Sequence, residues 1–293
     1  MVLESLLGPK RAESKPTSLF LLGVLYASIA LFLGLWIFKN QASLVLVFLT
    51  VMAAIPLVFR INILEEKRAM YLKGEIKLLR AHSKALFAFI FLFFGFVIAF
   101  SAWYLLLPEH LVQSTFNSQI ETIRSINGNL FGTPIIANSA IDANFAQSGV
   151  FLQIFSNNIK VLLFCIFFSF FYGAGAIFIL TWNASVIGTA IGNYIRTNLA
   201  ALAVESGFSK IGSYLGIYSL GLFRYALHGI PEILAYFTAG LAGGIISVAI
   251  IKHDLDSKYF RKIMLDSLDL IILAVLLLFA AALLEVYITP LIF

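Results

Sequence analysis

Residues 224–251 read RYALHGIPEILAYFTAGLAGGIISVAII, and this stretch decides how the rest of the chain is interpreted. It places Arg224, His228 and Glu232 beside or inside an apolar run that is long enough for a membrane helix. An ionisable side chain at membrane depth costs about 2.5–3.5 kcal/mol on insertion scales, so such residues are candidates for function. The central HGIPE sequence predicts that one helix ends near His228 and that the next helix begins at Pro231.

The composition indicates a helical membrane protein. Of the 293 residues, 61% are hydrophobic and only 12% are charged, whereas soluble domains have about 25% charged residues. The apolar runs exceed the roughly 18 residues that mark a spanning helix, while barrel strands alternate over about ten. We therefore predict an all-α, polytopic protein of the cell membrane. The composition predicts that the protein contacts the lipid bilayer, and we expect that it binds no nucleic acid.

Seven membrane spans are predicted from the apolar runs. They cover residues 18–38, 42–59, 85–107, 158–182, 210–228, 231–251 and 263–291. Residues 183–205 are less apolar and contain several small residues, so an interfacial or re-entrant segment is expected there. Residues 108–157 contain few charges and predict an external cap of surface helices.

The distribution of positive charge predicts the orientation. Basic residues gather in the N-terminal segment and in the loops at 60–84 and 252–262, which places these three inside and the C-terminus outside. The N-terminus is therefore expected to be cytoplasmic. The stretch 60–84 is either an amphipathic helix that binds a lipid or a protein partner, or an ordinary cytoplasmic loop that follows the positive-inside rule.

His228 and Glu232 are the best candidates for chemistry. Across the predicted turn they would converge, and such a pair orients a proton transfer, binds a divalent metal or neutralises a buried cation. The alternative is a structural polar network in which Arg224 pairs with Glu232. Asn158 and Asn183 flank the fourth span and complete the set of candidate polar residues.

No enzyme signature accompanies these residues. The chain has no HExxH, GxSxG or Walker-type sequence. Zinc needs three or four protein ligands, and the other histidines fall in loops or at span edges. We therefore expect no catalytic residue, no metal and no cofactor. The single cysteine, Cys165, lies within an apolar run and forms no disulfide inside the chain.

Small residues predict where helices break or pack closely. The GxxxG pair in the sixth span predicts a close helix contact, and we also take it as support for a homo-oligomer. The positions concerned are Gly173, Gly175, Gly188, Gly229, Pro231, Gly240 and Gly244.

The order of these motifs resembles the stage II sporulation protein M family. The motifs are Asn158, Gly173-x-Gly175, Asn183 with Gly188, His228-Gly229-x-x-Glu232, and the glycines from Gly240 to Gly244. The resemblance covers residues 84–293 and implies a five-span core with an external segment after its first helix. Residues 1–83, a hairpin of two spans followed by a basic cytoplasmic helix, fall outside it and are predicted to be an addition.

The resemblance also bears on function. The family's sporulation member is a non-enzymatic membrane partner of cell-wall hydrolases, and the role of relatives outside sporulation is unassigned. The leading hypothesis is therefore a membrane scaffold or assembly protein that binds other membrane or envelope proteins. A permease or permease-like subunit with a polar site at His228 and Glu232 is the alternative, and an intramembrane metal-dependent hydrolase is a third hypothesis.

Overall fold

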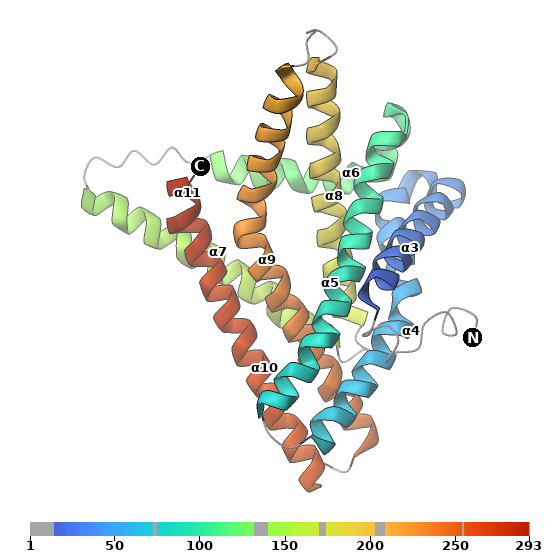
Figure 1. Cartoon of the computed structure of the whole chain (residues 1–293), viewed down its shortest axis with the longest axis vertical. Helices are drawn as coiled ribbons and strands as arrows, with labels where there is room; N and C mark the ends of the chain where they lie inside the picture. Colours follow the sequence, from blue (N-terminus) through green and yellow to red (C-terminus); the bar gives the residue numbers. More distant parts are fainter. Residues whose placement is uncertain are drawn as a thin grey trace.

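The computed structural model of the chain describes residues 15–72, 75–131, 140–169, 174–202, 209–253 and 255–292. Within these ranges the side chains are described except at positions 75–77, 79, 126–131, 140–147, 174–175, 198–202, 209–226 and 228. Every element of the described ranges is a helix (Figure 1). The predicted all-α fold is therefore confirmed.

The helices follow one another along the described parts of the chain. The elements are α3 (Pro16–Ile37), η1 (Lys39–Gln41), α4 (Ala42–Tyr71), α5 (Glu75–Leu106), α6 (Glu109–Phe131), α7 (Ala140–Ser169), α8 (Ala174–Leu202), α9 (Ser209–Lys252), α10 (Lys258–Leu283), η2 (Leu284–Ile288) and α11 (Thr289–Ile292).

Within the described residues, seven helical segments are long and apolar enough to cross a membrane, the number that the sequence predicts. They are Pro16–Ile37, Lys39–Tyr71, Arg80–Leu106, Ser148–Ser169, Ala176–Thr197, Gly229–Lys252 and Lys258–Ile292. The number agrees with the prediction, but two of the predicted boundaries are wrong.

The first error concerns the predicted fourth span, residues 158–182. The described residues assign this stretch to two candidate spans, Ser148–Ser169 and Ala176–Thr197, and not to one. The segment predicted to be interfacial lies mostly inside α8, whose candidate span ends at Thr197.

The packing of α8 explains its low hydropathy. A Cβ atom placed on Gly188 would lie 2.8 Å from Cβ of Phe100 on α5, and Ser101 Oγ donates a hydrogen bond to the Gly188 carbonyl at 3.0 Å. Gly188 therefore marks a close approach between helices, as predicted. A helix that faces protein needs small residues more than apolar ones.

The second error concerns the HGIPE turn. α9 runs through Pro231 without interruption, so the predicted spans 210–228 and 231–251 belong to one helix. A proline removes one hydrogen bond from a helix, whereas a break leaves about four carbonyl groups of the first helix and four N–H groups of the second without partners. Because water does not replace these bonds within a membrane, the continuous helix has the lower free energy.

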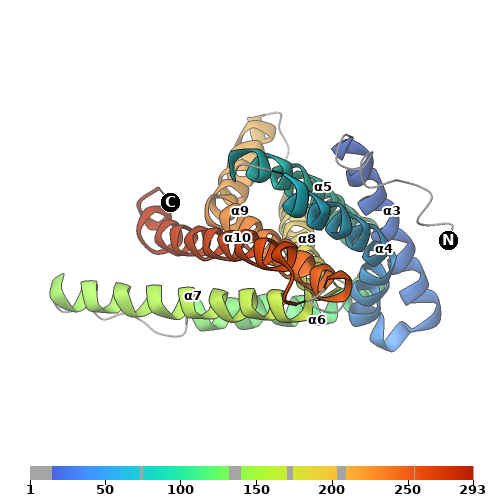
Figure 2. The same ribbon diagram turned by 90° about the horizontal axis from the view of Figure 1, so that it is seen from below.

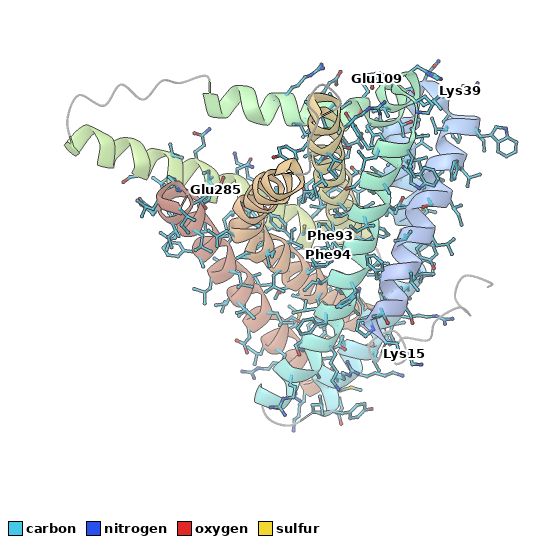
Figure 3. All side chains as sticks on the ribbon, turned by 45° about the horizontal axis from the view of Figure 1, so that its top comes forward. Lys15, Lys39, Phe93, Phe94, Glu109 and Glu285 are labelled. Atoms are coloured by element: carbon cyan, nitrogen blue, oxygen red, sulfur yellow. The ribbon has the colours of Figure 1, made fainter. Side chains whose placement is uncertain are left out.

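The two basic turns lie at the same end of the bundle, which is the lower end in Figure 1. Lys262 Nζ, near the start of α10, donates to the Leu72 carbonyl at the end of α4 at 2.7 Å. α6 lies across the bundle towards the other end, where Figure 3 labels Glu109 and Lys39. We call the lower end the basic end; that it faces the cytoplasm stays a prediction.

α9 is the central helix and α7 is peripheral. Of the residues in their most apolar windows, 83% are buried for α9 and only 17% for α7. Figure 2 shows α7 and α6 as a layer along one side of the molecule. The described part of α9 is therefore surrounded by protein, while most of α7 faces outwards.

The glycine-rich part of α9 contacts three neighbours. Gly240 faces Ala176 of α8, Gly244 faces Asn62 of α4, and a Cβ on Gly243 would lie 2.7 Å from Cβ of Ser169 on α7. The predicted close contact is confirmed, but it lies within one chain. This glycine face is therefore occupied and does not support a homo-oligomer.

A second close approach was not predicted from the sequence. α3 meets α5 at Gly23 and Gly95, where a Cβ on Gly23 would lie 3.1 Å from the Cα of Gly95. Each glycine stands alone in an apolar run, so no GxxxG spacing signals the contact.

These contacts predict that Gly243→Ala lowers the stability of the protein by about 1–3 kcal/mol, because the new methyl group forces α9 and α7 apart. Gly229→Ala is the matched control, since it lies on the same helix and a Cβ there meets nothing within 4 Å. Thermal unfolding of the purified protein measures both variants. Equal effects of the two substitutions would contradict the packing described.

Candidate functional site

Three polar side chains meet between α7 and α9. Asn158 Nδ2 donates a hydrogen bond to Glu232 Oε1 at 2.5 Å, and Tyr236 OH donates to Asn158 Oδ1 at 3.1 Å. Asn158 and Tyr236 are buried, with 8% and 5% of their surface exposed, and Glu232 is half-buried. The amide thus bridges a carboxylate and a phenol at membrane depth. We call these three residues the α7–α9 cluster.

Helix geometry brings the cluster together. Glu232 and Tyr236 are four residues apart on α9 and share one face, and the buried face of α7 presents Asn158 to them. The sequence singled out Asn158 and Glu232 but missed Tyr236. Its spacing from Glu232 was the available signal.

A second carboxylate approaches the cluster from the C-terminal part of the chain. Glu285 lies on η2, labelled in Figure 3, and interacts electrostatically with Glu232. η2 is a π-helix, a widened turn that is frequent at functional sites. Two carboxylates that lie close enough to interact electrostatically are the most reactive feature of the described membrane spans.

The other predicted site residues are distributed differently. The side chains of Arg224 and His228 lie outside the described residues, as does Gly173, and Gly175 is described only as part of the α8 backbone. Asn183 is half-buried on α8 and forms no hydrogen bond to the α7–α9 cluster. Their roles as site residues stay predictions.

A second polar cluster, which the sequence interpretation missed, lies at the basic end. Glu65 and Glu66 of α4 are 0% and 1% exposed. Glu65 pairs with Arg68 and with His82 of α5, whose Nδ1 lies 2.6 Å from Glu65 Oε2. We call this cluster, completed by the partners of Glu66, the glutamate clasp.

Glu66, the other glutamate of the clasp, contacts residues 186 and 187 positions further along the chain. His253 Nε2 lies 2.5 Å from Glu66 Oε1, and Lys252 Nζ lies 3.4 Å from Glu66 Oε2. The clasp therefore ties α4 to α5 and to the turn between α9 and α10. Because a buried carboxylate without a partner is costly, these ion pairs fix the register of the helices.

The clasp was predictable in part. Ile61, Glu65 and Ala69 follow at intervals of four and continue the buried face of α4 beyond its apolar run. Because both glutamates lie in the basic stretch 60–84, the sequence alone indicates an exposed position for them.

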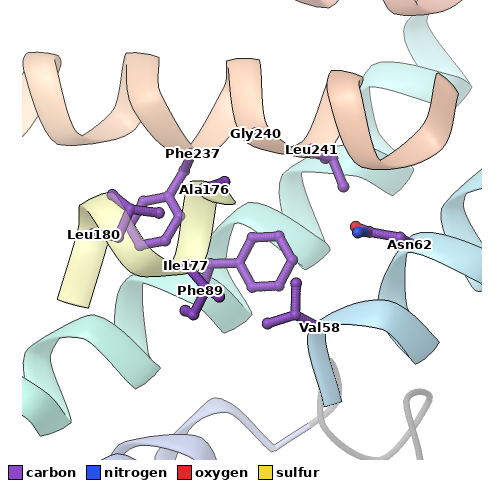
Figure 4. A pocket seen from close by; sticks show the side chains of 9 residues that line it. All are labelled: Val58, Asn62, Phe89, Ala176, Ile177, Leu180, Phe237, Gly240 and Leu241. Atoms are coloured by element: carbon purple, nitrogen blue, oxygen red, sulfur yellow. The ribbon is translucent and has the colours of Figure 1, made fainter. Parts of the chain in front are cut away.

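One small recess lies between α4, α5, α8 and α9, lined by the nine residues labelled in Figure 4. Asn62 is its polar member, and Asn62 Oδ1 has no hydrogen-bond partner. The other lining residues are apolar or glycine, and none belongs to the α7–α9 cluster. The recess thus offers little to a polar substrate.

The described part of the chain contains few groups that could bind a metal or act as a reactive thiol. No three side chains of His, Cys, Asp or Glu converge there at metal-binding distance. Cys165 is buried and free.

Seven candidate spans, joined by hydrogen bonds and ion pairs between helices, define a polytopic helical membrane protein. The model of the family described as Stage II sporulation protein M matches residues 86–290. The chain belongs to this family, as the sequence motifs suggested. Comparisons with curated proteins and with solved structures each gave no match.

The family match begins at residue 86, inside α5, so α3 and α4 lie outside it. The glutamate clasp joins α4 to Lys252 and His253, which lie within the matched residues. The division of the chain into 1–83 and 84–293 stays a prediction.

The α7–α9 cluster predicts that Asn158→Ala lowers the stability by about 1–2 kcal/mol, because Glu232 and Tyr236 both lose a buried partner. Asn183→Ala is the control, since it removes the same group from a half-buried position outside the cluster. Thermal unfolding in one detergent compares them. An Asn183 variant as unstable as the Asn158 variant would argue against the cluster.

The glutamate clasp predicts that Glu66→Ala lowers the stability by about 2 kcal/mol, because Lys252 and His253 lose their common partner. Hydrogen exchange should accelerate in the turn between α9 and α10. Glu121→Ala, at an exposed position on α6, is the control and should change neither quantity. Unaltered exchange in the Glu66 variant would contradict the clasp.

Proposed function

We propose that the protein is a non-enzymatic scaffold or assembly protein of the cell membrane, with its N-terminus in the cytoplasm. The observation that carries this proposal is the α7–α9 cluster. Asn158 of α7 forms hydrogen bonds with Glu232 and Tyr236 of α9, and these bonds join the two helices. Polar groups bonded in this way hold a membrane fold in one arrangement. A fixed arrangement is what a scaffold requires.

A platform for partners supports the same proposal. α6 is anchored by Gln119, a buried side chain whose Nε2 donates to the Ser43 carbonyl at 3.0 Å and to Ser185 Oγ at 3.2 Å. Its outward face is polar and exposed, with residues Glu109, Gln113, Asn117 and Glu121. An anchored segment with an exposed polar face suits docking of another membrane or envelope protein, although α6 is kinked at Phe116.

The orientation rests on charge. The glutamate clasp and its surrounding cations lie at the basic end, and loops rich in Lys and Arg stay on the cytoplasmic side. α6 then lies on the outer side, where envelope proteins are accessible.

A permease or permease-like subunit is the second candidate function. The electrostatic interaction of Glu232 with Glu285, which lies on a π-helix, favours it, because transporters place polar groups at irregular helices within the membrane. An intramembrane metal-dependent hydrolase, the third hypothesis, would need ligands that the described side chains do not bring together.

The scaffold proposal predicts that the outward face of α6, and not Glu232, determines function. The double variant Gln113→Arg/Glu121→Arg should lose the partner complex on native gels and fail to complement a deletion strain, with an unchanged amount of protein in the membrane. Glu232→Gln keeps a hydrogen-bonding group and should complement. Lys39→Glu, exposed in η1 at the same end, is the control and should also complement.

Reconstitution separates the two candidate functions. The scaffold proposal predicts that the purified chain in liposomes conducts no solute. A flux of ions or solute that Glu232→Gln abolishes would overturn the scaffold proposal and establish the permease.

A further inference from the structure

Cations without partners remain exposed at the basic end. They come from both basic turns, and within the described residues none of their side chains forms an ion pair or hydrogen bond. They are Lys67, Arg80, Lys84, Lys258 and Arg261. We call this set the basic patch.

The carboxylates that would neutralise the basic patch are withdrawn from the surface. Glu65 and Glu66 lie among these cations in the chain but are 0% and 1% exposed. Their carboxylates contact Arg68, Lys252 and the two histidines of the glutamate clasp. Among the described side chains of the two turns, Asp256 is the exposed carboxylate. The surface that remains is strongly positive.

The fold gathers the basic patch from distant parts of the sequence. Lys262 Nζ donates to the Leu72 carbonyl at 2.7 Å and to the Met70 carbonyl at 3.4 Å. This contact holds the start of α10 against the end of α4. The cations of α4 and α5 therefore stand beside those of α10, at the lower end in Figure 1.

Amphipathic side chains accompany the cations. Tyr71 is 70% exposed at the end of α4, and Tyr259 is 54% exposed beside Lys258. Tyrosine is enriched at membrane interfaces, where its ring lies at the level of the headgroups and its hydroxyl stays in water. Cations interleaved with such residues, at the ends of the candidate spans, match the chemistry of a phospholipid interface.

We propose that the basic patch binds the headgroups of anionic phospholipids in the leaflet at the basic end. The phosphate of an anionic lipid supplies the negative charge that the buried carboxylates do not present at this surface. A lipid is also the anionic ligand that is always within reach, because the same helices are embedded in the bilayer. An acidic protein or a nucleic acid would not need Tyr71 and Tyr259 at the level of the headgroups. The inference is independent of whether the protein is a scaffold or a permease.

Native mass spectrometry and thermal unfolding of the full chain test the proposal. The protein is reconstituted in nanodiscs of phosphatidylcholine, with or without phosphatidylglycerol. Wild type should retain phosphatidylglycerol at least about tenfold above its share of the mixture, as expected for several cations acting together. Its unfolding temperature should rise with the anionic lipid.

Neutral variants identify the residues responsible. Lys258→Gln/Arg261→Gln should reduce retention, and the replacement of all five cations by Gln should abolish it together with the thermal shift. Lys39→Gln/Arg124→Gln is the matched control, because it removes two exposed cations from the other end. These side chains are exposed, so the fold should be unaffected, and the unfolding temperature in phosphatidylcholine alone checks this directly.

Three results would overturn the proposal. The first is equal retention of phosphatidylglycerol by wild type and by the variant in which all five cations are replaced. The second is an equal loss in the control at Lys39 and Arg124. The third is an identical thermal shift with inorganic phosphate added to phosphatidylcholine discs, which would show that any anion suffices.

Discussion

The structure depends on the close approach of α9 to its neighbours. Gly240, Gly243 and Gly244 place the backbone of α9 against α8, α7 and α4. Within a bilayer the exclusion of water from apolar surfaces no longer drives helices together, so association relies on dispersion contacts and hydrogen bonds at short range. The α7–α9 cluster adds such bonds at Asn158 and Glu232. Packing and polar contacts thus stabilise the same pair of helices.

The two ends of the bundle are specialised in different ways. At the basic end, the glutamate clasp draws carboxylates inside, ties α4 to the α9–α10 turn, and leaves cations on the surface. At the other end, Arg196 of α8 donates to the Tyr104 and Leu107 carbonyls at the end of α5 and pairs with Glu109 of α6. One end therefore suits a charged lipid surface, and the other presents the exposed polar face of α6.

The sequence predicted what depends on local composition and missed what depends on tertiary contacts. Apolar runs predicted seven spans, and the motifs around Asn158, Gly188 and Glu232 predicted the family. The prediction of a helix break at HGIPE was wrong because helix propensities describe proline in water, where the groups at a helix end are hydrated. Within a membrane no water replaces the lost hydrogen bonds. The glutamate clasp was missed because partners of Glu66 are far apart in the sequence and only the fold brings them together.

The most direct test of the account is an experimental structure in a lipid bilayer at a resolution that shows ordered water around Glu232. The account predicts that Asn158 bridges Glu232 and Tyr236 and that no chain of water molecules connects them to either membrane surface. A continuous column of water from Glu232 and Glu285 to one surface would contradict a structural role for the cluster. The permease would then be the better description of this protein.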